Sequence, residues 1–284
     1  MKKIKRIFTL LVIFQAVIAC RSSDEPHPAA PKKVIVELKQ SNVDLGTHKL
    51  AAFSMIRNSK YLVVFEAGLG DDHSIWNTNN VALKIADSID IVTYDRASHG
   101  QSQRGPDPRD INRLQSELTY IVDVFAKGRK VVLIGHSLGG FIIKDWAIKN
   151  PTRIAGLLFV DPSVAVLGST MTQADQDAFY NSWVASNGLT NGCTLEAKEL
   201  KNDVEYMATS GNLPNVPVIV LTCLKLDGTY TADDQQAHFN YQASLGIGVS
   251  DFTQVARPNS GHMMMIDDPK TLIEYIQVLL ATLD

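Results

Sequence analysis

The sequence predicts an α/β fold in which a mainly parallel central sheet is flanked by helices on both faces. Strand-like and helix-like segments alternate along residues 34–284. The strand-like segments are short, almost continuously apolar runs, as expected for parallel strands that are buried on both faces. One of these runs leads through Gly-x-Ser-x-Gly directly into a helix-like segment. This alternation predicts a parallel sheet that is covered by its own connecting helices.

The first half of this domain begins with three expected strands. Residues 34–38 and 50–56 predict an opening pair, and 61–66 predicts a third that is short and rich in β-branched residues. A helix is expected over 74–86 and a buried strand over 89–94. A second helix is expected over 111–125, where apolar residues keep helical spacing and charged residues lie between them, at the positions Ile111, Leu114, Leu118, Ile121, Val122 and Phe125.

The second half continues the alternation. Residues 130–134 predict a strand and 141–148 a helix, which Asn150 and Pro151 end. Further apolar strands are expected over 154–160, 216–222 and 252–256. Residues 271–283 form an amphipathic pattern that predicts the closing helix.

Residues 163–215 interrupt this order, because they carry no convincing strand and separate two strands that should be neighbours. Helix-like pieces at 173–185 and 195–207 predict a small helical lid, inserted before the penultimate strand. An insert of this length without its own core is more often functional than idle. On the second helix we expect the acidic side chains to form a solvated face, at Glu196, Glu199, Asp203 and Glu205.

The Gly-x-Ser-x-Gly sequence presents Ser137 as a candidate nucleophile. At a sharp turn from strand to helix, its hydroxyl would stand at the top of the sheet, above the helix N-terminus. Gly135 and Gly139 remove side chains that would collide where the chain doubles back, and Gly140 allows close helix packing. Strand alternation points His136 away from the site, so a packing role is expected for it.

The N-terminus predicts export. Residues 1–19 combine a basic segment with an apolar run too short to span a bilayer comfortably, which is typical of a signal peptide. The run ends in Val-Ile-Ala-Cys and resembles a bacterial lipobox, which implies cleavage before Cys20, lipidation of that residue and anchoring to a bacterial membrane, periplasmic or surface-facing. An ordinary secretory signal is the alternative. Residues 20–33 are expected to be a flexible tether, leaving 34–284 as one domain with the lid at 163–215.

Charge and cysteine content limit the possible partners. Removing residues 1–19 takes away four basic residues and leaves 23 Lys and Arg against 30 Asp and Glu, a formal charge of −7. This balance argues against nucleic acid as a partner. Cys193 and Cys223 remain in a compartment that permits disulfides, and the sequence leaves open whether they pair. Oligomeric state is also left open.

Four motifs in order resemble the α/β-hydrolase family. Residues 63–70 match the strand and loop of its oxyanion hole, with Glu66-Ala67 where many members have a His-Gly-type pair. Residues 92–102 resemble its Tyr-Asp-Arg-x-x-x-Gly-x-Ser turn, the turn at Ser137 is the third motif, and Ser260-Gly261-His262 is the fourth. The resemblance covers residues 34–284 and implies an α/β-hydrolase fold with a serine nucleophile, a histidine and an acid.

The resemblance assigns the remaining catalytic roles. His262 is the expected general base, since a serine hydroxyl becomes a strong nucleophile only when a neighbouring imidazole takes its proton. By family position, the oxyanion donors are the backbone N–H groups of Leu69 and Leu138, typically worth about 2.7–4 kcal/mol each. The acid is Asp161, which ends the strand after the nucleophile helix, or Asp227, which follows the next strand but falls one residue late for the common Gly-x-x-Asp pattern.

These residues predict a serine hydrolase that cleaves carboxylic esters, acting on a small-molecule ester or amide. A serine nucleophile argues against epoxide and haloalkane chemistry, which needs a carboxylate. Alternatives are a peptidase or amidase of the same fold, and a non-catalytic, lipid-anchored binding protein. No cofactor and no metal is expected: Asp71-Asp72-His73 looks like a metal cluster, but adjacent side chains do not converge, and capping of the next helix is the simpler reading.

Overall fold

The computed structural model describes residues 37–165, 171–225 and 232–283. The predicted signal peptide, Cys20, the tether and Asp227 lie outside these residues. Among the described helices, none is both long and apolar enough to cross a bilayer.

The described strands form one eight-stranded sheet in the order β1-β2-β4-β3-β5-β6-β7-β8. β1 and β2 are antiparallel to each other, β2 is antiparallel to β4, and the remaining neighbours are parallel. The predicted mainly parallel sheet is therefore confirmed. The strands are β1 (Lys39–Asp44), β2 (Lys49–Met55), β3 (Leu62–Glu66), β4 (Asp90–Tyr94), β5 (Val131–His136), β6 (Ile154–Val160), β7 (Val218–Cys223) and β8 (Phe252–Arg257).

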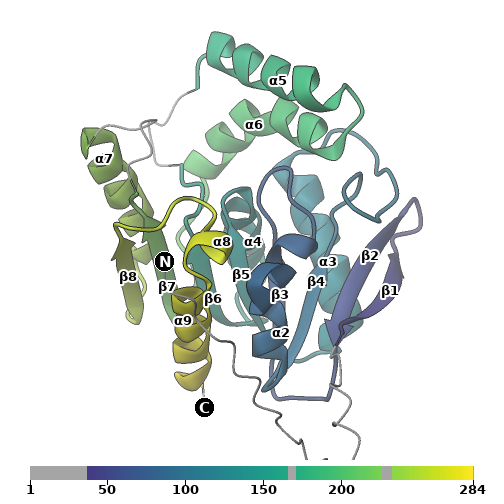
Figure 1. Cartoon of the computed structure of the whole chain (residues 1–284), viewed down its shortest axis with the longest axis vertical. Helices are drawn as coiled ribbons and strands as arrows, with labels where there is room; N and C mark the ends of the chain where they lie inside the picture. Colours follow the sequence, from purple (N-terminus) through teal and green to yellow (C-terminus); the bar gives the residue numbers. More distant parts are fainter. Residues whose placement is uncertain (1–36, 166–170, 226–231, 284) are drawn as a thin grey trace, which may run out of the picture. The chain divides into compact units, whose positions relative to one another are not determined.

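Helices cover both faces of the sheet (Figure 1). One core is formed with α3 and α4, and a second core on the other face with α2, α8 and α9. Every residue of β3 to β7 is buried, which explains the continuous apolar runs in the sequence. The helices of the body are α1 (Ser74–Asn77), η1 (Thr78–Asn80), α2 (Val81–Ala86), α3 (Ile111–Ala126), α4 (Leu138–Lys149), α7 (Ala232–Ala243), η2 (Ser244–Gly246), α8 (Met264–Asp267) and α9 (Pro269–Ala281).

Two sequence predictions about the first half differ from the structure in detail. Of the strand expected over 34–38, only residues 37 and 38 are described, and they are not in a strand; the first described strand, β1, begins at Lys39. Its mostly exposed, polar residues carry no apolar pattern, as is common in an edge strand. The helix expected over 74–86 is broken into α1, η1 and α2. Asn79 and Asn80 adopt positive φ angles of 54° and 58°, which asparagine tolerates better than most residues.

The predicted lid consists of two helices between β6 and β7, α5 (Gln173–Asn187) and α6 (Gly192–Ala208). Figure 1 shows them beyond one end of the sheet. Thr172 and Asp175 form a capping box at the start of α5. The buried side chain of Gln176 donates to the backbone carbonyls of Ala197 and Lys198, so the two helices are held together by hydrogen bonds as well as by packing.

The expectation that the acidic residues of α6 form a solvated face was wrong for two of them. Glu196 and Asp203 are buried, at 2% and 3% exposure. Glu196 pairs with Arg96, and Asp203 Oδ1 accepts a hydrogen bond of 2.8 Å from the backbone N–H of Ile111 at the start of α3. Asp203 therefore links the lid to the body. Burial raises its pKa to about 8, and the neighbouring Asp110 and Glu199 add to the effect.

We predict that Asp203→Asn changes how stability depends on pH. A carboxyl whose pKa is raised by folding binds its proton more tightly in the native state, so wild-type stability falls as pH rises from about 4 to 8. The amide keeps the acceptor for Ile111 and has no charge to bury. The free energy of unfolding of the variant, relative to that of the wild type, should therefore increase between pH 4 and pH 8, by on the order of a few kcal/mol.

Urea unfolding of both proteins at several pH values measures this difference. Glu205→Gln, at an exposed position on the same helix, is the control. A difference between Asp203→Asn and wild type that stays constant with pH would contradict a buried, protonated Asp203.

Candidate active site

The turn between β5 and α4 holds Ser137 in a strained conformation, with φ 51° and ψ −118°. Its backbone N–H donates to the Val160 carbonyl at the end of β6, and its carbonyl accepts from Ser163 N–H. A Cβ on Gly139 would lie 2.5 Å from the Glu66 carbonyl oxygen, and one on Gly135 would lie 2.6 Å from the Gly139 carbonyl oxygen. Only glycines allow this close backbone approach, as the sequence predicted.

Asp161 lies directly beside this turn, at the end of β6. It is 4% exposed and adopts a φ of +40°, unusual for a non-glycine residue. Its Oδ2 accepts a hydrogen bond of 2.6 Å from His262 Nδ1, and its Oδ1 accepts from Cys223 N–H at 3.1 Å. The structure thus places Asp161, the first of the two candidate acids, in hydrogen-bonding contact with His262, the predicted base.

The pKa of Asp161 lies well below its usual range. Burial on its own would raise it, but hydrogen bonds from His238 and His262, together with the charges of these imidazoles, outweigh burial. The carboxyl is therefore ionised over the whole range in which an enzyme operates, and it can orient an imidazole and stabilise its protonated form.

His262 follows β8 in a loop that is fixed by two contacts. Gly261 N–H donates to Asp267 Oδ2 at 2.8 Å, and His136 Nε2 donates to the His262 carbonyl at 2.9 Å. The rings of His136 and His262 lie 4.6 Å apart. Burial lowers the pKa of His136 to about 3, so this ring stays neutral. The sequence predicted that His136 packs and points away from the site. Its side chain is buried as expected, but it lies against the His262 loop and not away from it.

The His262 imidazole and the Ser137 hydroxyl, both described, are not hydrogen-bonded to each other. Such bonds are often long in the absence of substrate and tighten when it binds. Ser137 is half-buried and the His262 side chain is 52% exposed, so both are accessible to a ligand.

The two predicted oxyanion donors belong to segments that touch. Leu138 begins α4, and the backbone after β3 turns through Gly68 and Gly70 on either side of Leu69. A Cβ on Gly139 would lie 2.5 Å from the Glu66 carbonyl oxygen and 2.8 Å from that of Ala67, so the start of α4 lies against the segment that leads to Leu69. Among the described residues, neither the Leu69 nor the Leu138 N–H donates to a protein acceptor, as is normal for a free turn and a first helical residue.

A buried arginine holds the loop that carries Leu69. Arg96, 1% exposed, donates to the carbonyls of Ala67 and Gly68 at 2.7 and 2.8 Å. It also pairs with Glu66 at 2.9 Å and with both carboxylate oxygens of Glu196 at 2.8 Å. Burial raises the pKa of Glu66 to about 7, against the opposing charge of Arg96. Glu66 is thus an ion-pair partner of Arg96. In the sequence, the Tyr-Asp-Arg motif singled out Arg96, but nothing indicated that Glu66 and Glu196 would be its partners.

His99 and the segment containing Asp72 and His73 contact acidic side chains from distant parts of the chain. His99 is buried, 3.7 Å from Glu196, against the first turn of α6. His73 Nδ1 donates to Asp95 Oδ1 at 2.7 Å, and Asp72 lies close enough that the three side chains form a compact group. Sequence reasoning about Asp71 and Asp72 missed Asp95, which is distant in the chain. Its oxygens already accept from the backbone of His73 and Gln101.

The two cysteines whose pairing the sequence left open, Cys193 and Cys223, are free and buried. Trp183 on α5 lies over the oxyanion loop, since a Cβ on Gly70 would meet its ring at 3.1 Å. Of the lid aromatics, Phe179 and Trp183 are in edge contact, with ring centroids 6.1 Å apart.

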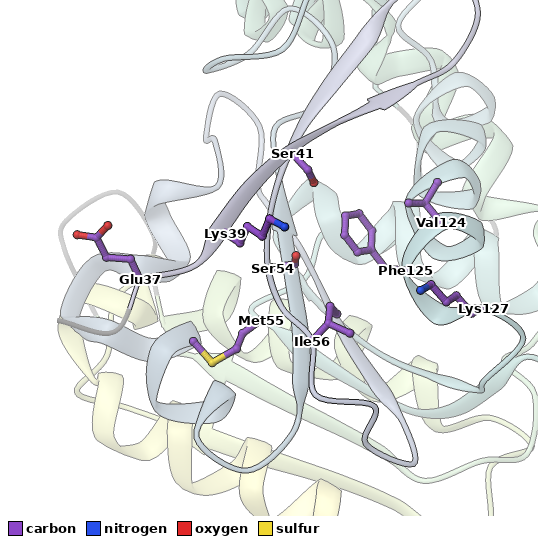
Figure 2. Close-up of a pocket in the computed structure, with 9 residues that line it drawn as sticks. All are labelled: Glu37, Lys39, Ser41, Ser54, Met55, Ile56, Val124, Phe125 and Lys127. Carbon is purple, nitrogen blue, oxygen red and sulfur yellow. The ribbon is translucent and has the colours of Figure 1, made fainter. Parts of the chain in front are cut away.

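A cavity of about 530 Å³ lies elsewhere, between β1, β2 and the end of α3 (Figure 2). Its lining includes Ser54, Phe125 and Lys127 but no histidine. Met55, which also lines the cavity, pairs with Ile91, the second residue of β4, so this cavity lies toward the amino ends of the parallel strands, opposite the edge that carries Ser137. It offers no activated nucleophile.

The fold and the nucleophile turn define a class of protein. Residues 63–275 match the alpha/beta hydrolase family, and the chain belongs to it. Among curated proteins, the chain is 24% identical over 213 residues to the uncharacterized protein YqjL of Bacillus subtilis, covering 75% of this chain and 80% of that protein.

Solved structures share the fold. The epoxide hydrolase CorEH superposes with a TM-score of 0.68 at 15% identity, over 87% of this chain and 100% of that one. An esterase from Thermogutta terrifontis superposes with a TM-score of 0.64 at 16% identity, over 86% of this chain and 99% of that one. The chain is thus similar to hydrolases of several chemistries, and its own residues must decide among them.

We predict that Gly139→Ala destabilises the protein by about 1–3 kcal/mol, because the new methyl group would overlap backbone oxygens that cannot move independently. Gly211→Ala is the matched control: its nearest neighbour is Ile148 Cγ2 at 3.9 Å, and its stability should stay within about 0.5 kcal/mol of wild type. Denaturant midpoints report both. Equal midpoints for the two variants would be inconsistent with close packing at the nucleophile turn.

Proposed function

We propose that this α/β hydrolase is a serine hydrolase that cleaves carboxylic esters through an acyl-enzyme, with Ser137 as nucleophile, His262 as general base and Asp161 as acid. The observation that carries the proposal is the 2.6 Å contact between Asp161 Oδ2 and His262 Nδ1 beside the strained Ser137 turn. The ionised, buried carboxylate fits the role of a group that fixes the imidazole tautomer.

In the proposed reaction, His262 Nε2 takes the proton of Ser137 Oγ while the oxygen attacks the ester carbonyl carbon. The negative charge that forms on the carbonyl oxygen is received by the N–H groups of Leu69 and Leu138. His262 then gives its proton to the departing alcohol. Water, deprotonated by the same imidazole, attacks the acyl-enzyme and releases the acid.

Two observations favour ester cleavage over the alternatives. The nucleophile position holds a serine, so epoxide opening through an alkyl-ester intermediate has no carboxylate to begin it. A peptidase that binds a substrate amine needs a free acidic group in the lid, whereas Glu196 is neutralised by Arg96. Other acidic residues of α6 remain available, and an amide substrate is therefore the second candidate.

We predict that a fluorophosphonate probe labels the wild-type chain beginning at residue 21 and fails to label Ser137→Ala. A serine hydroxyl reacts with such probes only when a base activates it. Turnover of p-nitrophenyl acetate and butyrate in the same samples tests ester cleavage itself. A folded wild type that neither labels nor turns over ester would favour the non-catalytic binding protein.

The acid is tested separately. Asp161→Asn should lower the rate by a factor on the order of 10⁴, because an amide leaves the imidazole in the wrong tautomer. Asp227→Asn is the matched control and should retain near wild-type activity. The reverse result would move the acid to Asp227.

We also propose that the chain is exported and lipid-anchored to a bacterial membrane through Cys20, periplasmic or surface-facing. Support comes from the basic and apolar residues 1–19 and the Val-Ile-Ala-Cys sequence at their end. Because a single acyl chain binds membranes only marginally, the multiple acylation implied by a lipobox accounts for stable anchoring.

In a bacterial host fed a clickable palmitate analogue, the wild type should incorporate lipid and sediment with membranes, and Cys20→Ala should do neither. Cys193→Ala, which leaves the N-terminus intact, is the control. Release of an unlabelled wild type as a processed, soluble protein would point to an ordinary secretory signal.

A further inference from the structure

The Asp161 carboxylate contacts a second imidazole, that of His238, besides the imidazole of His262. His238, on α7, places Nε2 2.8 Å from Asp161 Oδ1, while His262 Nδ1 lies 2.6 Å from Oδ2. Oδ1 also accepts from Gln242 Nε2 and Cys223 N–H, each at 3.1 Å. The carboxylate is thus surrounded by donors, and two of them belong to residues that can change charge.

The remaining contacts of α7 keep His238 in this place. Gln242, one turn further along the helix, is fully buried and donates to the carbonyl of Pro162 as well as to Asp161. Its Oε1 accepts from Thr222 at the end of β7. The His238 side chain itself is 41% exposed, so protons reach it from solvent while its Nε2 faces Asp161.

We propose that His238 is a positioning residue for the reaction proposed above. It donates a hydrogen bond to Oδ1 of Asp161 and thereby keeps Oδ2 facing His262. Both imidazoles therefore interact with the same negative charge. This inference rests on the proposed function, since its role is exerted on the base of that reaction. His238 touches neither Ser137 nor, by this proposal, the substrate.

The sign of the effect follows from charge. A protonated His238 repels a proton on His262, and even a neutral N–H donor at Oδ1 weakens the carboxylate as an acceptor for His262. Both effects disfavour the protonated form of the His262 imidazole. Without His238, the His262 imidazole holds its proton to a higher pH. The acid limb of the pH–rate profile therefore moves to higher pH, by about 0.5–1 unit for two partly exposed imidazoles that contact one carboxylate.

Among the described side chains, the other titratable or charged groups near His238 and His262 belong to elements other than α7. Two of them stay neutral across the range of interest: burial lowers the pKa of His136 to about 3 and raises that of the Cys223 thiol to about 12. On α7 itself, Asp233 is exposed. Asp71, Asp267 and Arg257, all described, also interact electrostatically with His262 or Cys223. A change at His238 leaves all of these in place.

The test is the rate of fluorophosphonate labelling of Ser137, measured from about pH 5 to 9, the range in which histidines act as bases. The proteins are wild type, His238→Leu, His238→Gln and the exposed α7 control Gln236→Leu. We expect the acid limb of His238→Leu to rise by about 0.5–1 unit, that of His238→Gln, which keeps a neutral donor, to rise less, and that of Gln236→Leu to match wild type.

A His238→Leu protein that loses rate equally at every pH, or that behaves as wild type, would overturn the proposal, because a structural role alone leaves the limb unmoved. Thermal unfolding of each variant establishes that it is folded. Titration of the His262 ring protons by NMR in the same proteins separates two failures. If the wild type is not labelled but the His262 titration differs between wild type and His238→Leu, the proposed function is wrong. If the wild type is labelled and the His262 titration is the same in both proteins, the role of His238 is wrong.

Discussion

The guanidinium of Arg96 connects the parts on which the site depends. It lies fully buried between β3, β4 and α6, and it pairs with one carboxylate from the body, Glu66, and one from the lid, Glu196. Its remaining N–H groups bind the carbonyls of Ala67 and Gly68. A buried charge of this kind is costly unless every partner is present, so the loop and the lid helix are restrained together.

This arrangement has a chemical consequence. Leu69 follows Gly68 directly, so fixing the Gly68 carbonyl also limits where the Leu69 N–H points. If Leu69 N–H is a donor in the proposed reaction, its prior orientation would let it stabilise the developing charge without having to reorganise. Burial raises the pKa of Glu66, the charge of Arg96 opposes this effect, and the nearby charge of Glu196 adds to it.

Asp161 is a second buried charge on which the site depends. The carboxylate lies at the end of a central parallel strand, where it meets loops from β5, β7 and β8 at one edge of the sheet. In parallel sheets generally, the loops that follow the carboxyl ends of the strands meet at one edge, although they come from distant parts of the chain. Donors from Cys223, His238, Gln242 and His262 converge on it from positions 62 to 101 residues away.

Much of the fold was readable from the sequence because buried parallel strands require continuous apolar runs. Residues 154–160 were predicted with the same bounds as β6, and the Ser137 turn was predicted from glycines whose absent side chains make room for backbone. The lid was recognised because its helices interrupt the strand order. Such features depend on neighbours in the chain, and a single sequence contains them.

Tertiary structure alone decided the rest. The polar edge strand β1, the burial of Glu196 and Asp203, and the position of His238 next to Asp161 all depend on segments that meet only after folding. No local pattern distinguishes a glutamate on a solvated helix face from one that faces a buried arginine 100 residues earlier. A short-range pattern determines where strands and turns form, whereas the partners of charged side chains are set by long-range packing, because the free energy of a buried charge depends on everything that surrounds it.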